Sequence, residues 1–164
     1  MNRRQGLRLL LGLLPLSAGM AVAQDDPGKA AIGKVNVKVY YGTNGDPSVA
    51  GPRFNAVEGE VEKQLRGAPN LDFRHFLLLG GDQQPLFRSY ENWAQPLRPS
   101  DEILVRFEAR SRPTADSARL DLEIWISRKK ILKTDALLGG DTPLFILGPE
   151  WRGGRLIIAV SLAS

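Results

Sequence analysis

The sequence predicts a mainly β protein: an antiparallel β-sandwich or open barrel of about eight strands with one helix. Three observations support this prediction. Short stretches of alternating apolar and polar residues follow one another at intervals of roughly 8–15 residues. Glycine, proline and asparagine cluster between these stretches, as they do in turns. Only one stretch has helical spacing, and strands that succeed one another without helices favour antiparallel pairing.

The composition supports one folded domain and excludes several kinds of site. A chain of 164 residues, 43% of them hydrophobic, is long enough to bury its own core. A net charge of +4 is too small to keep such a chain disordered. Because cysteine is absent, the sequence excludes disulfides, thiolate metal sites, cysteine nucleophiles and a lipid-modified N-terminal cysteine.

Residues 1–23 are predicted to be a secretory signal peptide. Three arginines precede the apolar run Leu9–Leu16, and small residues end the segment. Cleavage is expected between Ala23 and Gln24, which predicts a periplasmic or extracellular protein that meets the membrane only through this segment. The run is shorter than the about 20 apolar residues of a spanning helix. A retained membrane anchor is the alternative.

Most of the basic character belongs to this first segment. Residues 1–23 contain three of the 22 basic residues and none of the 18 acidic ones, so the remainder has a net charge of about +1. No basic patch for nucleic acid is therefore expected.

The first part of the domain is predicted to hold one strand and the only helix. Residues 24–33 are expected to form a flexible N-terminal arm before a single β-rich domain over 34–164. Alternation from Lys34 to Tyr41 predicts a strand with one buried face. Residues 55–66 are predicted to be helical, because apolar residues recur at helical spacing and Asn55 is suited to cap the first turn.

The rest of the chain is predicted to consist of strands and turns. Gly80, Gly81 and Asp82 are expected to turn the chain after the strand that follows the helix. A hairpin is expected around Ser127, because alternation is clear over 120–126 and a short connection of three residues leads to the next stretch, 130–136. The expected strands after the helix cover 71–79, 86–93, 103–110, 120–126, 130–136, 143–147 and 156–162.

Three short stretches carry a resemblance to known proteins. They are the stretch Ser89–Trp93, the stretch Leu147–Arg155, and the apolar residues Leu71, Phe73, Phe76 and Leu79. Over residues 70–155 the chain resembles small exported bacterial β-rich domains of uncharacterised function. The resemblance implies an exported β-rich fold, and it implies no activity.

The sequence gives little support for a catalytic histidine or a metal site. His75 is the single histidine, and its alternation with apolar neighbours predicts a structural side chain on the core-facing side of a strand rather than a catalytic base. One histidine cannot form a histidine metal cluster, and the Asn–Asp turns lack the spacing of a calcium loop. No metal and no cofactor are expected.

Carboxylates are the remaining candidates for catalysis. Glycoside hydrolysis needs two of them beside one bond. The candidates are Glu91, Glu108, Asp121, Glu123 and Glu150. Their places on outward strand faces and turns predict solvated charges, so no catalytic residue is predicted.

Surface aromatic residues are the best candidates for binding. Trp151 lies in a predicted turn with Arg152 and Arg155, and Trp93 lies among polar neighbours on its strand. Tryptophan and arginine are enriched in binding hot spots. The alternative is that Trp151 folds back over the open end of the sandwich.

The sequence thus predicts an exported, non-enzymatic β domain that binds or supports a component of the bacterial cell envelope, either a protein or a polysaccharide. Two alternatives stay open. One is a carbohydrate-binding module that uses Trp93, Trp125 and Trp151 as stacking platforms, and the other is a hydrolase that uses acids alone.

Overall fold

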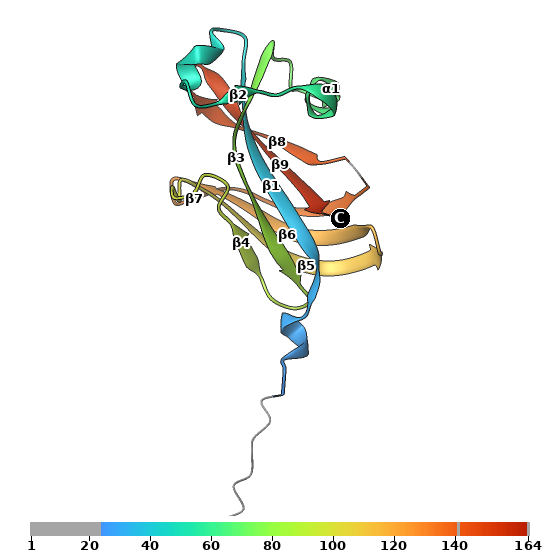
Figure 1. The fold of residues 1–164 in the computed structure, drawn as a ribbon. Coiled ribbons are helices and arrows are strands. Elements are labelled where there is room, and N and C mark those ends of the chain that lie inside the picture. Colours follow the sequence, from blue (N-terminus) through green and yellow to red (C-terminus); the bar gives the residue numbers. More distant parts are fainter. Residues whose placement is uncertain (1–23, 141, 164) are drawn as a thin grey trace, which may run out of the picture.

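The computed structural model describes residues 24–140 and 142–163. The predicted signal peptide, with Ala23 at its end, lies outside the described residues. Two antiparallel sheets face each other and form an open sandwich, as predicted (Figure 1). One sheet has the strand order β2-β3-β1-β9-β8 and the other has the order β4-β5-β6-β7. The described residues contain no helix that is long and apolar enough to cross a membrane.

Most strands are longer than the sequence pattern predicted, but the predicted strand 71–79 begins only at His75, and residues 88–91 of the predicted strand 86–93 lie outside any strand. Those of the five-stranded sheet are β1 (Ala31–Thr43), β2 (Asn55–Ala56), β3 (His75–Phe87), β8 (Leu144–Trp151) and β9 (Gly154–Ala163). Those of the four-stranded sheet are β4 (Asn92–Ala94), β5 (Ile103–Thr114), β6 (Ser117–Ile126) and β7 (Lys129–Gly139). The predicted hairpin around Ser127 is confirmed, because β6 and β7 pair from one end to the other, with one register shift at Ile131.

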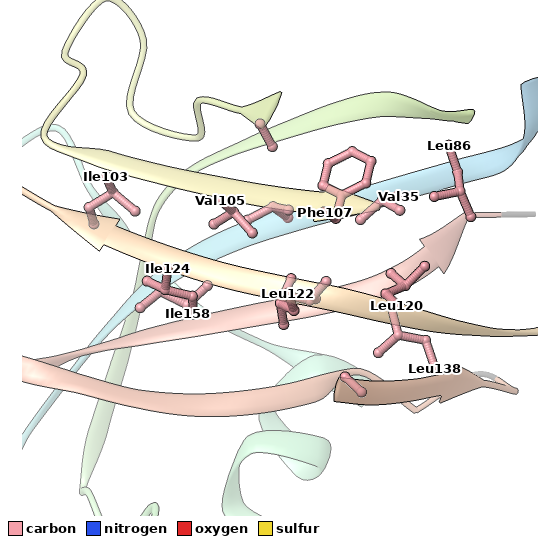
Figure 2. Packing of buried hydrophobic residues seen from close by; sticks show 14 of the residues in the cluster. Val35, Leu86, Ile103, Val105, Phe107, Leu120, Leu122, Ile124, Leu138 and Ile158 are labelled. Atoms are coloured by element: carbon pink, nitrogen blue, oxygen red, sulfur yellow. The ribbon is translucent and has the colours of Figure 1, made fainter. Parts of the chain in front are cut away.

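The main core fills the space between the two sheets. Side chains of β5 and β6 meet side chains of β1 and β9, among them Val35 and Ile158 (Figure 2). Alternate residues of β5, from Ile103 to Phe107, are fully buried, as their alternation predicted. Burying a side chain of this size contributes about 1.5–3 kcal/mol, so this layer is the main source of stability.

A second, smaller core lies on the other face of the five-stranded sheet. There the helix α1 (Gly59–Gly67) covers Tyr40, Phe76 and Ile157 with its buried Leu65. Because β1 is covered on both faces here, the neighbouring residues Tyr40 and Tyr41 are both buried. This explains why the period-two pattern is lost at the end of β1.

The predicted helix begins too early. Residues 55–66 were expected to be helical, but Asn55 and Ala56 form β2 and pair with β3. The amide of Val57 also donates to the carbonyl of Phe76 at 2.9 Å. Since this backbone is committed to the sheet, the helix begins at Gly59, with Glu58 in the capping position and without a side-chain capping bond.

The predicted turn at Gly80–Asp82 is wrong, because β3 continues through it to Phe87. Just before the two glycines the pairing of β3 with β1 shifts by one residue, since Val39 lies opposite Gly80 and Tyr40 lies opposite Leu78. At Gly80 an added Cβ would lie 2.2 Å from the carbonyl oxygen of Pro96. The glycine is therefore there to admit the loop that follows β4, not to reverse the chain.

The residues of the predicted arm also contain regular structure. Pro27–Lys29 form a short 3-10 helix, and the side chain of Asp26 accepts a 2.8 Å hydrogen bond from the amide of Gly28. The first strand begins at Ala31, three residues before the predicted Lys34, because its start pairs with the end of β3.

Candidate binding face

The turn around Trp151 is held against the end of the sandwich. The Trp151 ring is partly buried and meets the ring of Tyr41 edge-on, with 5.5 Å between the ring centroids. The guanidinium of Arg152 lies 4.4 Å from the centroid of the Trp151 ring and donates to the carbonyl of Ala50 at 2.6 Å. This is the folded-back placement that the sequence left open as the alternative.

Arg155 is engaged with its own hairpin. Its Nε and Nη2 atoms donate to the carbonyl of Gly148 at 3.0 and 2.7 Å, beside the register shift between β8 and β9. Trp151, Arg152 and Arg155 do share one shallow hollow of about 500 Å³, which Asn44 and Glu150 also line. The cations of this hollow are therefore already bonded to backbone carbonyls.

Trp93 lies on the opposite sheet, apart from the other three predicted binding residues. It is on β4 and is 37% exposed. Its ring lies 6.2 Å from the ring of Trp125, centroid to centroid, at an angle of 54°. The structure thus brings together two of the three tryptophans on the outer face of the four-stranded sheet.

Both rings are fixed by a carboxylate two residues earlier in the chain. The Nε1 of Trp93 donates to Glu91 at 3.3 Å, and the Nε1 of Trp125 donates to Glu123 at 3.1 Å. The ammonium of Lys130 lies 5.5 Å from the centroid of the Trp125 ring. Rings held in this way lose little further freedom on meeting a ligand.

Arg106 is the centre of an ion-pair network beside these rings. It lies on β5, directly opposite Trp93 on β4 and Glu123 on β6. Its guanidinium contacts Glu91 at 2.5 Å, Glu108 at 2.9 Å and Asp121 at 3.6 Å. We call the outer surface formed by Glu91, Trp93, Arg106, Glu123 and Trp125 the tryptophan face.

Further cations surround the two carboxylates of β6. Asp121 also contacts Arg110 at 2.9 Å and Lys133 at 3.6 Å. Glu123 contacts Lys130 at 3.4 Å and Lys133 at 3.5 Å. The expectation that these two carboxylates are solvated is wrong, since each residue is only 6% exposed. Long basic side chains cover them, which alternation along one strand cannot reveal.

The network keeps its carboxylates ionised. Burial alone would raise the pKa of Asp121, but the hydrogen bond from Arg110 and the nearby charges outweigh it and hold that pKa below its ordinary value. At Glu123 the hydrogen bonds from Trp125 and Lys130 outweigh burial in the same way and lower the pKa. The hydrogen bond from Arg106 lowers the pKa of Glu91.

His75 lies elsewhere than predicted. It is the first residue of β3 and is exposed, so its alternation with apolar residues did not place it on the core-facing side. His75 lies at the very start of the strand, beyond the packed region. The next two residues, Phe76 and Leu77, pack on opposite sides of the sheet, so both faces are apolar there. Within 24–140 and 142–163, no cluster of three or more acidic or histidine side chains is placed to hold a metal ion.

The sequence singled out Trp93 and Trp125 as stacking platforms and Glu123 as a carboxylate, but it indicated neither Arg106 nor the proximity of these residues. Arg106, Glu123 and Trp125 come from two further strands, and their position beside Trp93 depends on the strand register. The repeated Glu-x-Trp spacing at 91–93 and 123–125 is a signal that was present in the sequence. Comparison with protein-family models, curated proteins and solved structures found no match for this chain.

Proposed function

We propose that this protein is an exported, non-enzymatic binding module that attaches to a polysaccharide of the cell envelope through the tryptophan face. The observation that supports this most is the pair of Trp93 and Trp125, two rings 6.2 Å apart that are each fixed by a carboxylate. The apolar faces of sugar rings stack on indole, and their hydroxyls bond to charged and polar groups around it.

The charges of the face favour an uncharged polymer. Arg106, Lys130 and Lys133 lie among the carboxylates of Glu91 and Glu123 at 2.5–3.5 Å. Each charge therefore has an opposite charge beside it, and the surface offers many hydrogen-bonding groups without a field that would attract a polyanion.

The same charges count against a hydrolase on this face. A glycosidase needs one carboxylic acid with a raised pKa to protonate the leaving group. At Glu91, Asp121 and Glu123 the pKa is instead lowered. The carboxylates act as acceptors that orient the two indoles and the surrounding cations.

Binding is tested with the cleaved chain on a glycan array and with insoluble cell-wall polysaccharide in a pull-down assay. We expect the wild type to be retained, and Trp93→Ala and Trp125→Ala each to lower retention by about tenfold or more. Trp93→Phe should restore part of it because it keeps an aromatic surface. Val49→Ala is the matched control, since Val49 is 54% exposed on the short 3-10 helix Pro47–Ala50, outside the four-stranded sheet.

Each variant needs a melting curve by circular dichroism, so that loss of fold is not mistaken for loss of binding. If the wild type retains no glycan, or if binding is unchanged in both tryptophan variants, the proposed function is wrong. Hydrolysis of a glycan that disappears in Glu123→Gln would favour the acid-only hydrolase instead.

Export is tested separately by mass spectrometry of the N-terminus after expression in a bacterium. A mature chain that begins at Gln24 is expected. A chain that keeps residues 1–23 would contradict cleavage and favour the retained anchor.

A further inference from the structure

We infer that two copies of this protein pair through β7 as antiparallel neighbours, with Thr134 on the twofold axis. The strand has eleven residues and pairs with β6 alone, so it forms one edge of the four-stranded sheet. An edge strand presents unpaired amide and carbonyl groups, which can bind another strand. The inference does not depend on the proposed polysaccharide binding.

The other edges of the sandwich are poorly suited to such pairing. Two edge strands are short, β2 with two residues and β4 with three, and the lengths of β3 and β5 that they leave uncovered contain Pro85 and Pro113. The edge strand β8 contains Pro149, which has no amide hydrogen, and its register with β9 shifts beside that residue. The edge strand β7 is long and proline-free, and its one register shift with β6, at Ile131, lies near one end of the strand.

Apolar side chains stand exposed along the outer side of β7. Leu137 is 60% exposed and Ile131 is 43% exposed, which makes them two of the six exposed large hydrophobic residues of the described chain. Ile131 and Leu137 are six residues apart, so a strand that covers both must present two apolar side chains at the same spacing. A second copy of β7, reversed, offers the same two residues.

Reversal about Thr134 matches residues 131–137 with themselves, and the register shift with β6 falls at Ile131, at one end of this stretch. It places Ile131 opposite Leu137 of the second copy, and Lys133 opposite Asp135. On the core-facing side it places Leu132 opposite Ala136, which extends the buried layer across the junction. In antiparallel pairs, opposite residues point to the same side of the sheet, so outer residues meet outer ones and inner residues meet inner ones.

The charges select this register over its neighbours. An axis at Lys133 would set two lysines opposite each other, and an axis at Asp135 would set two carboxylates opposite each other. Like charges in directly opposite positions destabilise a strand pair. Only the axis between them, at Thr134, sets Lys133 of each copy opposite Asp135 of the other, so that neither charge faces a like charge.

The lysines of this edge do not block the approach of a second strand. Lysines on edge strands commonly discourage pairing. Here Lys130 and Lys133 are directed onto Glu123 of the same sheet, at 3.4 and 3.5 Å. Asp135 is bonded to Arg119 at 3.3 Å. These side chains are drawn toward β6, on the side of β7 away from the open edge.

The paired copies would share one continuous eight-stranded sheet. Both tryptophan faces would then lie on the same side of that sheet. Two sites on one rigid body can engage one polymer together, and the second contact is then made at a raised effective concentration.

The absence of cysteine provides a direct test. In a chain with Thr134→Cys, the new thiol is the only one, and the axis brings it opposite its copy at an antiparallel spacing of about 4.5–5.5 Å between Cα atoms, within disulfide range. We expect mild oxidation to give a disulfide-linked dimer in high yield. Val49→Cys is the control, an exposed thiol away from β7 that should give little dimer.

Sedimentation or light scattering over a range of concentrations measures the association itself. The wild type should dimerise, and Asp135→Lys should raise the dimer dissociation constant by about tenfold or more, since it sets lysines opposite each other twice. Asp101→Lys is the matched control, because Asp101 makes only an exposed 3.9 Å pair with Arg128. A wild type that stays monomeric, or a Thr134→Cys chain that oxidises no faster than Val49→Cys, would overturn the inference.

Discussion

The hydroxyl of Tyr41 donates a 2.8 Å hydrogen bond to the carbonyl oxygen of Arg152, which lies 111 residues later in the chain. Tyr41 is 1% exposed, and its ring also supports the partly buried ring of Trp151. The bond therefore joins the end of β1 to the turn between β8 and β9. It fixes a turn whose residues Arg152 and Gly153 both have positive φ angles.

Tyr41→Phe should lower the free energy of unfolding by about 1 kcal/mol, because the carbonyl of Arg152 loses its donor in a partly buried bond. Urea denaturation followed by circular dichroism measures the change. Tyr90→Phe is the matched control: Tyr90 is 44% exposed and its partner Asp26 is also at the surface, so its loss should cost below about 0.5 kcal/mol. Equal losses in the two variants would argue against a structural role for the Tyr41 bond.

Gly80→Ala should destabilise the protein strongly. The new methyl group would lie 2.2 Å from the carbonyl oxygen of Pro96, so the loop after β4 must move away from β3. A loss of about 3 kcal/mol or more in urea denaturation is expected. Gly67→Ala, at the end of the helix with nothing near its Cβ position, should be neutral or slightly stabilising. If Gly80→Ala were as stable as wild type, the close approach would be wrong.

Arg106→Met should cost about 2 kcal/mol, because Glu91, Glu108 and Asp121 all lose a cation. Arg106→Lys should recover only part of this loss, since a single ammonium cannot reach all three carboxylates in the geometry of a guanidinium. Thermal unfolding and urea denaturation give the comparison. Arg128→Met removes a fully solvated pair and should change stability by below about 0.5 kcal/mol.

The stability of the protein should fall in acid, and Asp121 should account for part of the fall. Its pKa is lowered in the folded state, so its contribution is complete above the ordinary pKa of the unfolded chain, about 4, and is lost as the pH falls through the lower folded value. Asp121→Asn should therefore be less stable than wild type at pH 7, with a difference that shrinks below about pH 4. Urea denaturation at several pH values tests this, and a difference independent of pH would refute it.

Period-two alternation predicted the strands whose two faces differ, and failed where both faces are covered or where a loop crosses the sheet. β5 fits the prediction because one face meets the core and the other is more exposed. Gly80 and Gly81 were predicted to form a turn, because the sequence does not distinguish a glycine that makes room for a crossing loop from one that reverses the chain. The sequence contains Pro96, but not its position over β3.

The candidate face was only partly predictable for a related reason. Trp93 stood out as an aromatic residue among polar neighbours, and that local pattern is readable. Its proximity to Arg106 and Trp125 follows from cross-strand register, which depends on the packing of the whole sheet. Trp151 stood out equally, but its contact with Tyr41 required the pairing of distant strands.

The central position of β1 has a consequence for the order of folding. β5, β6 and β7 pair with their neighbours in sequence and can form as soon as they exist, whereas β1 needs β9 at the far end of the described chain. A chain that is still emerging from the ribosome can complete the meander but not the five-stranded sheet. Closure of the sandwich is therefore a late, non-local and comparatively slow event. Until β9 is available, the backbone groups of β1 on that edge have no strand partner.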